Sequence, residues 1–159
     1  MNKTLLALLL PLALAACGQP GDLKYNEVVT SAFLANVQRI DRDMERLING
    51  DFDPGQGASP GSPAGNPGEH IAELEKNLNQ VQQLQHSPDA SQFASNLSRY
   101  YELQIGYYQQ LKRYAETTDQ AKKETLAQSL ATTYQSLRGL PEQIFAAQKQ
   151  FLERTGRLH

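Results

Sequence analysis

The chain has 159 residues, a formal net charge of −2 and a single cysteine. A nucleic-acid-binding protein normally gathers a basic excess on one face, and the absence of any such excess argues against nucleic acid as a partner. One cysteine cannot form an intrachain disulfide, so the stability of the fold must come from packing. The length suffices for one domain with one core.

The N-terminal residues have the pattern of a secretory leader. Lys3 supplies a positive charge, residues 4–14 are rich in Leu and Ala, and the small residues Ala15 and Ala16 precede Cys17. The apolar stretch is shorter than the roughly 20 residues that a membrane-spanning helix needs. We expect residues 1–16 to be a signal peptide that is removed.

The segment Leu14-Ala15-Ala16-Cys17 resembles the lipobox of bacterial lipoprotein precursors. The resemblance implies that the thiol of Cys17 receives a diacylglycerol before cleavage and that Cys17 becomes the acylated N-terminus, held durably in the membrane by two or three chains. Gly18 stands where lipoproteins retained in the inner membrane commonly have aspartate, so the resemblance implies a lipid anchor in the outer membrane. We expect the domain on the periplasmic face, and the cell surface stays open as the alternative. In the alternative interpretation, Cys17 is an incidental residue after an ordinary cleavage site.

Residues 17–23 are expected to form the lipidated cysteine and a short tether, followed by a helix to Ile48. From Tyr25 to Leu47, apolar residues recur at spacings of three, four and seven, and charged residues, Arg39 among them, fall on the opposite side. Asn49 and Gly50 provide a typical helix stop. This pattern predicts an amphipathic helix.

Residues 51–68 contain five Gly and four Pro, a composition that cannot form a packed core. We expect a flexible, disordered connection. Such a long loop suggests either a crossover between distant helix ends or a projection into solvent.

Helical patterning then continues to about Thr155. A second helix is expected from Glu69 to near Ser87, a third from Pro88 to about Thr117, a fourth from about Asp119, and a fifth after a break at residues 139–141. Alternating β-branched or aromatic runs are missing from the sequence. The fold class predicted for residues 24–159 is an all-α, up-and-down bundle of four to five helices.

The third of these helices carries an aromatic face. Two rows of residues are spaced by seven, Phe93, Tyr100, Tyr107 and Tyr114 in one and Leu97, Gln104 and Leu111 in the other, with Tyr101 and Tyr108 beside them. We expect this helix to be central.

The aromatic face provides the candidate ligand-binding residues Tyr100, Gln104, Tyr107 and Tyr108. They could line a pocket for an apolar, aromatic or sugar ligand, which predicts a cavity beside Gln104. The simpler interpretation is that the tyrosines fill the core and that a tyrosine hydroxyl bonds Gln104. Asn36 and Asp43 on the first helix could join such a polar network.

Metal sites and catalysis find little support. His70 and Glu73 share a helix face, but a second pair of ligands is missing, and His70 is expected to be solvated. Asn49, Asp51 and Asp53 resemble the first ligands of a calcium loop, but prolines stand where that loop needs its glycine and its glutamate. A glycine-flanked serine elbow is missing too, so we expect no metal, no cofactor and no enzymatic activity.

The sequence therefore predicts a membrane-anchored envelope lipoprotein with a non-catalytic helical domain that binds a protein partner or supports an envelope complex. One alternative is a small-ligand carrier or sensor that uses a tyrosine-lined bundle interior. Another is a surface adhesin.

Overall fold

The computed structural model describes residues 20–49 and 67–157. Cys17, the expected signal peptide and most of the Gly/Pro-rich connection lie outside these ranges. The described helices are α1 (Pro20–Asn49), α2 (Pro67–Gln83), the 3-10 turn η1 (Pro88–Ala90), α3 (Ser91–Glu116), α4 (Gln120–Arg138) and α5 (Leu140–Arg154). With no strand in the described ranges, the predicted all-α bundle is confirmed. None of these helices combines the length and the apolar character needed to cross a membrane.

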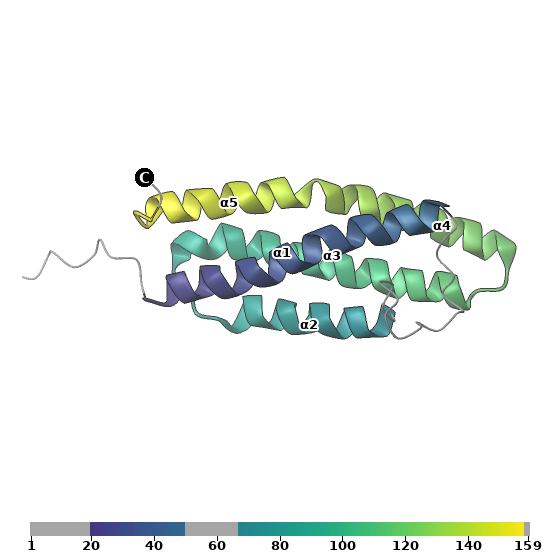
Figure 1. Cartoon of the computed structure of the whole chain (residues 1–159), viewed down its shortest axis with the longest axis horizontal. Coiled ribbons are helices and arrows are strands. Elements are labelled where there is room, and N and C mark those ends of the chain that lie inside the picture. Colours follow the sequence, from purple (N-terminus) through teal and green to yellow (C-terminus); the bar gives the residue numbers. More distant parts are fainter. Residues whose placement is uncertain (1–19, 50–66, 158–159) are drawn as a thin grey trace, which may run out of the picture.

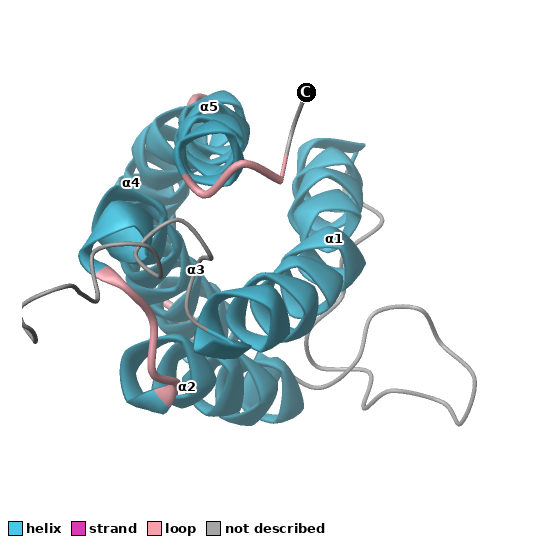
Figure 2. Ribbon diagram, turned by 90° about the vertical axis from the view of Figure 1, so that its left-hand side faces the viewer, coloured by secondary structure: helices cyan, strands magenta, loops and turns pink. Residues whose placement is uncertain are grey.

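The helices lie side by side along the long axis of the molecule (Figure 1). α1, α2 and α3 run in alternating directions, and α4 and α5 follow one another along a single line as the fourth member of the bundle. In the view along the bundle, α3 lies between α2 and the α4–α5 pair, and α1 lies across the interior from the α4–α5 pair (Figure 2). The start of α1 and the end of α5 lie at the same end of the molecule.

α1 begins four residues earlier than expected, so the prediction of a tether to residue 23 is wrong from Pro20 onward. Pro20 suits a first helical position because a proline there forfeits no helical hydrogen bond. Asp22 is fully buried, and its Oδ1 accepts a hydrogen bond of 2.7 Å from the backbone N–H of Ser87. This bond fastens the first turn of α1 to the connection between α2 and α3.

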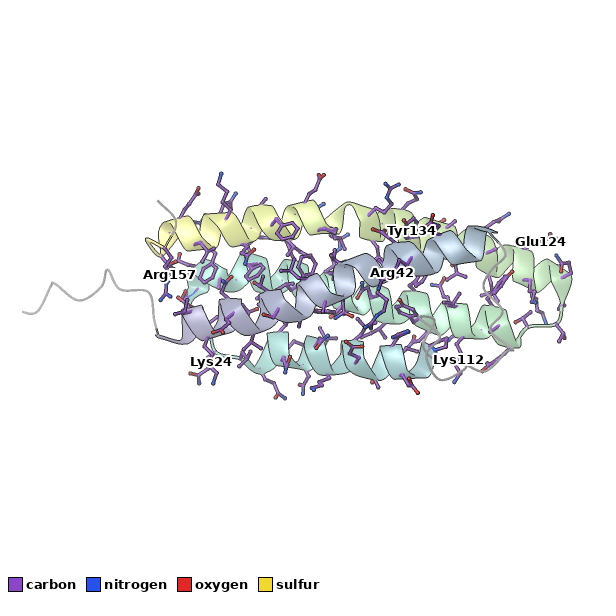
Figure 3. The ribbon with its side chains drawn as sticks, in the orientation of Figure 1. Lys24, Arg42, Lys112, Glu124, Tyr134 and Arg157 are labelled. Atoms are coloured by element: carbon purple, nitrogen blue, oxygen red, sulfur yellow. The ribbon has the colours of Figure 1, made fainter. Side chains whose placement is uncertain are left out.

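α3 is the central helix, as predicted. It packs against α2, α4 and α5. Its predicted aromatic face is buried, with Tyr100, Tyr101, Tyr107 and Tyr108 at most 2% exposed, and side chains fill the space between the helices (Figure 3). Phe33 of α1 meets Tyr100 edge to face at 5.2 Å between centroids, whereas the rings of Phe93 and Phe151 stack at 6.2 Å. Aromatic pairs favour both arrangements.

The helix boundaries follow the local signals. Asp119 caps α4 by accepting a hydrogen bond of 3.2 Å from the N–H of Lys122. Pro67 and Gly68, expected in the flexible connection, instead begin α2. α2 ends at Gln83, earlier than expected, and Ser87 is extended, the backbone conformation that a following proline imposes.

The junction of α4 and α5 bends the chain very little. Gly139 has φ −83° and ψ −13°, which is close to helical backbone, and Pro141 falls in the first turn of α5. Because proline has no N–H to donate, it interrupts the hydrogen-bond ladder without forcing a turn here. The predicted break is present, but the two segments continue along one axis (Figure 1).

Candidate functional site

All four predicted ligand-binding residues lie on α3 and are buried. Nε2 of Gln104 donates a hydrogen bond of 2.8 Å to the hydroxyl of Tyr100, the pairing expected for a buried glutamine among tyrosines. Tyr107 and Tyr108 contact each other edge to face at 5.4 Å and belong to the core. Of the four, Tyr100 alone lines the pocket at the α4–α5 junction.

Two buried polar atoms of α3, near the Tyr100 hydroxyl, are among those that have no hydrogen-bond partner in the described part of the chain. They are Oε1 of Gln104 and the hydroxyl of Tyr101. Burial raises the pKa of Tyr100 and of Tyr101, and the negative charge of Asp41 raises that of Tyr100 further. Both hydroxyls therefore stay neutral over the physiological range.

Asn36 does not join this network. It is buried, but its amide donates a hydrogen bond of 2.8 Å to the carbonyl of Ala32 on its own helix. Its Oδ1 accepts a bond of 3.3 Å from Nη1 of Arg39. The side chain of Asp43 lies outside the described set.

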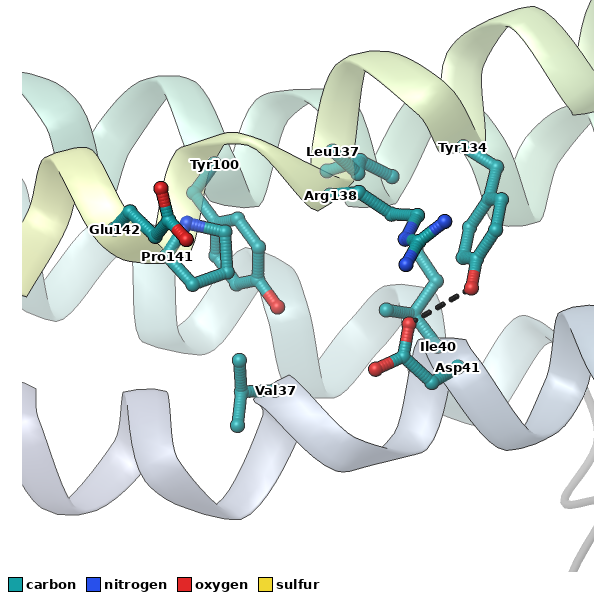
Figure 4. Close-up of a pocket in the computed structure, with 9 residues that line it drawn as sticks. All are labelled: Val37, Ile40, Asp41, Tyr100, Tyr134, Leu137, Arg138, Pro141 and Glu142. Atoms are coloured by element: carbon teal, nitrogen blue, oxygen red, sulfur yellow. Dashed lines mark hydrogen bonds between the residues drawn. The ribbon is translucent and has the colours of Figure 1, made fainter.

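A pocket of about 300 Å³ opens where α4 meets α5 (Figure 4). Four helices contribute to it. Its lining residues are Val37, Ile40 and Asp41 of α1, Tyr100 of α3, Tyr134, Leu137 and Arg138 of α4, and Pro141 and Glu142 of α5. The pocket is thus one hydrogen bond away from Gln104, through the hydroxyl of Tyr100.

The pocket is lined by buried aliphatic side chains and by exposed charged side chains. Ile40 and Leu137 are buried, whereas Asp41, Arg138 and Glu142 are exposed to solvent. The pocket therefore combines apolar walls with charged groups that are open to solvent.

Tyr134 connects α4 to α1 at one side of this pocket. Its hydroxyl donates a hydrogen bond of 2.9 Å to Oδ1 of Asp41, drawn as a dashed line in Figure 4. Desolvation raises the pKa of Tyr134 most, and the hydrogen bond to Asp41 adds to that rise. The guanidinium of Arg138 lies 5.9 Å from the centre of the Tyr134 ring, within cation–π range. These contacts restrict the positions of the Asp41 carboxylate and the guanidinium.

A second polar bridge joins α1 to α5 nearer the N-terminal end of α1. Nε2 of Gln148 donates to Oδ1 of Asn26 at 2.7 Å and to Oγ1 of Thr30 at 2.8 Å. We call the boundary between α1 and the α4–α5 pair the seam. It extends from this bridge to the Tyr134–Asp41 bond, and the pocket is part of it.

Two of the large apolar side chains exposed to solvent belong to this seam. Phe145 is 43% exposed, and its ring lies 5.4 Å from that of Phe33. Leu34 is 50% exposed and falls four residues after Thr30 and three before Val37, which places it on the same side of α1 as both. Exposed apolar surface therefore adjoins the pocket.

His70 and Glu73 both contact the guanidinium of Arg39. Nη1 of Arg39 lies 2.6 Å from Oε2 of Glu73 and 3.1 Å from Nδ1 of His70. His70 is half-buried, with its ring 5.2 Å from that of Tyr108, so the prediction of a solvated histidine is wrong. Periodicity placed Arg39 on the polar side of α1, but that side borders α2.

In residues 20–49 and 67–157 we find no cluster of three metal-ligating side chains. Asp51 and Asp53, which resemble calcium ligands in the sequence, lie outside these ranges.

The polar residues of the pocket were missed at the level of sequence. Asp41, Arg138 and Glu142 carried no sequence signal that linked them. No protein-family model matches the chain, and no curated protein or solved structure is significantly similar to it. Among the described lining residues of the pocket there is no serine, cysteine or histidine to pair with its carboxylates as a nucleophile or base.

Proposed function

We propose that this chain is an envelope protein, anchored by lipid at Cys17, whose helical bundle binds a small ligand without transforming it. The pocket at the α4–α5 junction is the observation that carries the proposal. Its volume of about 300 Å³ is at the lower end of the usual range for ligand sites. Its polar groups come from separate helices and surround aliphatic walls. This arrangement favours the ligand carrier or sensor over the partner-binding protein that the sequence pointed to first.

The lipobox-like sequence supports the anchor. Two residues separate Cys17 from Pro20, the first residue of α1. Because an extended chain advances at most about 3.6 Å per residue, a lipid on Cys17 would hold the start of α1 close to the membrane surface. The bundle would thus act next to the membrane.

Protein binding is the second candidate, and the exposure of Leu34 and Phe145 favours it. Both side chains belong to the seam that contains the pocket. A partner that covers them would also close the pocket. The changes Leu34→Ala and Phe145→Ala should then abolish crosslinks to this partner without altering ligand binding by the isolated protein.

Native mass spectrometry of protein extracted gently from membranes tests the ligand-binding function. We expect the wild type to carry a bound small molecule and Val37→Phe, which fills the pocket, to lose at least nine-tenths of it. The control Ala35→Phe adds the same ring at an exposed position of α1 and should retain the ligand. Ligand-free masses for both wild type and Val37→Phe, even after incubation with cell extract, would contradict the proposal.

A further inference from the structure

The charges of the pocket are unequal. Asp41 and Glu142 contribute two carboxylates, and Arg138 contributes one guanidinium. An anionic ligand would have to approach both carboxylates, whereas a cationic ligand meets two opposite charges and one like charge. The balance favours a positively charged ligand.

The aromatic side chains favour the same sign of charge. The negative faces of tyrosine rings attract cations, and Tyr134 already has the guanidinium of Arg138 at 5.9 Å from its ring centre. The bond from the Tyr134 hydroxyl to Oδ1 of Asp41 orients that carboxylate within the pocket (Figure 4). A cation bound here would find an oriented carboxylate next to an aromatic ring.

The remaining lining limits the size and the polarity of the ligand. Val37, Ile40, Leu137 and Pro141 offer only hydrocarbon, so the body of the ligand must be apolar to gain from contact with them. A volume of about 300 Å³ leaves room for a compact body and not for a long chain.

We propose that this pocket binds a small organic cation, an amine or quaternary ammonium with a compact hydrocarbon body. The cationic group lies between Asp41 and Glu142, and the body packs against Val37, Ile40 and Leu137. The inference rests on the proposed function, because it names the chemical class of ligand for the same pocket.

Three probes that share one ring and differ in charge test this inference. Cyclohexylammonium, cyclohexanol and cyclohexanecarboxylate are titrated at neutral pH into the lipidated protein in detergent micelles. The methyl resonances of Ile40, Leu137 and Val37 report on binding. We expect saturable shifts with cyclohexylammonium, at a Kd at least tenfold below that of cyclohexanol, and no saturation with the carboxylate.

Two charge variants should change the affinity in opposite directions. Glu142→Gln should weaken cyclohexylammonium binding at least fivefold, because it removes one of the two carboxylates. Arg138→Gln should strengthen it several-fold, because it removes the like charge. Glu124→Gln, on α4 close to the α3–α4 turn (Figure 3), is the matched control and should leave the affinity unchanged. A general loss of folding cannot produce opposite changes from two neighbouring helices.

The inference is overturned if cyclohexanol or the carboxylate binds as tightly as the ammonium, if Glu142→Gln fails to weaken binding, or if the ammonium produces no saturable shift. The proposed function stands or falls separately, because the native mass measurement on wild type and Val37→Phe uses no chosen probe. A neutral or anionic molecule found there would refute the cation and leave the ligand-binding function intact.

Discussion

At the scale of single residues, Asp22 makes a buried long-range contact at the start of α1. It is fully buried, and its Oδ1 accepts the N–H of Ser87 across 65 positions of sequence. Asp22→Ala should lower the free energy of unfolding by about 1.5–3 kcal/mol, since it leaves a buried N–H without its charged acceptor. Urea denaturation measures the loss.

Two further variants control this prediction. Asp22→Asn keeps an oxygen at the position of the acceptor and should lose less stability than Asp22→Ala. Asp89→Ala removes an exposed carboxylate of η1 and should change the free energy of unfolding by less than about 0.5 kcal/mol. Equal stabilities for Asp22→Ala and Asp89→Ala would show that the bond to Ser87 does not hold α1.

Gln104 leads to the opposite prediction. Its Oε1 is buried without a partner among the described residues, and its amide bonds only Tyr100. Gln104→Met has a similar shape and removes the unsatisfied oxygen, so we expect a free energy of unfolding equal to or above that of the wild type. Gln104→Ala should instead lose about 2 kcal/mol or more through the cavity that it leaves. A loss above about 1 kcal/mol in the methionine variant would indicate a role for the amide that packing does not explain.

These two residues also show what the sequence could predict at this scale. The pairing of Gln104 with Tyr100 was predictable because the residues are four apart on one helix and must share a face. The burial of Asp22 was not, since its partner Ser87 belongs to a distant connection. Arg39 was misjudged for the same reason, because its partners lie on α2.

At the scale of elements, the junction of α4 and α5 depends on Pro141 more than on Gly139. Gly139 has near-helical dihedral angles, and an added Cβ would meet nothing within 4 Å. Gly139→Ala should therefore raise the free energy of unfolding by about 0.4–1 kcal/mol, because it restricts the unfolded chain at no steric penalty. Thermal unfolding of this variant should show a higher Tm, and a lower Tm would mean that the junction needs the freedom of glycine.

The elements themselves were largely predictable. Apolar spacing identified each helix, and the prolines and capping residues marked most boundaries to within a few residues. The start of α1 was misplaced because the sequence up to residue 23 was interpreted as a tether, whereas Asp22 and Tyr25 are buried in the bundle and the helix begins before them. Tertiary contacts therefore decided the one boundary where local signals conflicted.

At the scale of the whole molecule, we expect the buried tyrosines to make the folded state less stable at alkaline pH. Burial raises the pKa of Tyr25, Tyr100 and Tyr101 above the ordinary value of about 10. The unfolded chain ionises these groups near pH 10, but the folded protein keeps them protonated. The contribution of these neutral tyrosines to the free energy of unfolding is thus fully present below about pH 10. Above that pH the free energy of unfolding falls by up to about 1.4 kcal/mol per pH unit for each tyrosine.

Denaturation by urea from pH 8 to pH 11 measures this dependence. Tyr101→Phe removes one of the three hydroxyls, so the free energy of unfolding should fall less steeply above pH 10 in this variant than in the wild type. Tyr134→Phe, at a half-exposed position, is the matched comparison and should reduce the slope less. Parallel curves for wild type and Tyr101→Phe would contradict burial of that hydroxyl.

The pocket is formed by residues of α1, α3, α4 and α5, and it was the feature that the sequence predicted least well. Periodicity shows which face of each helix is buried, but not how far one helix is shifted along its neighbour. Asp41, Arg138 and Glu142 come together only because α1 lies alongside the α4–α5 junction at one axial position. Of the predicted ligand-binding residues, Tyr100 lines this pocket, Gln104 bonds to Tyr100, and Tyr107 and Tyr108 pack in the core.

The proposed lipid anchor at Cys17 would determine where this pocket works, and one measurement tests it directly. The N-terminal peptide of the protein purified from membranes is analysed by mass spectrometry, beside a Cys17→Ala variant. We predict a peptide that begins at Cys17 and carries the mass of its acyl chains, and a variant that retains its leader and gains no lipid. An unmodified cysteine, with the protein in the soluble fraction, would contradict the anchored state and leave a freely diffusing binding protein.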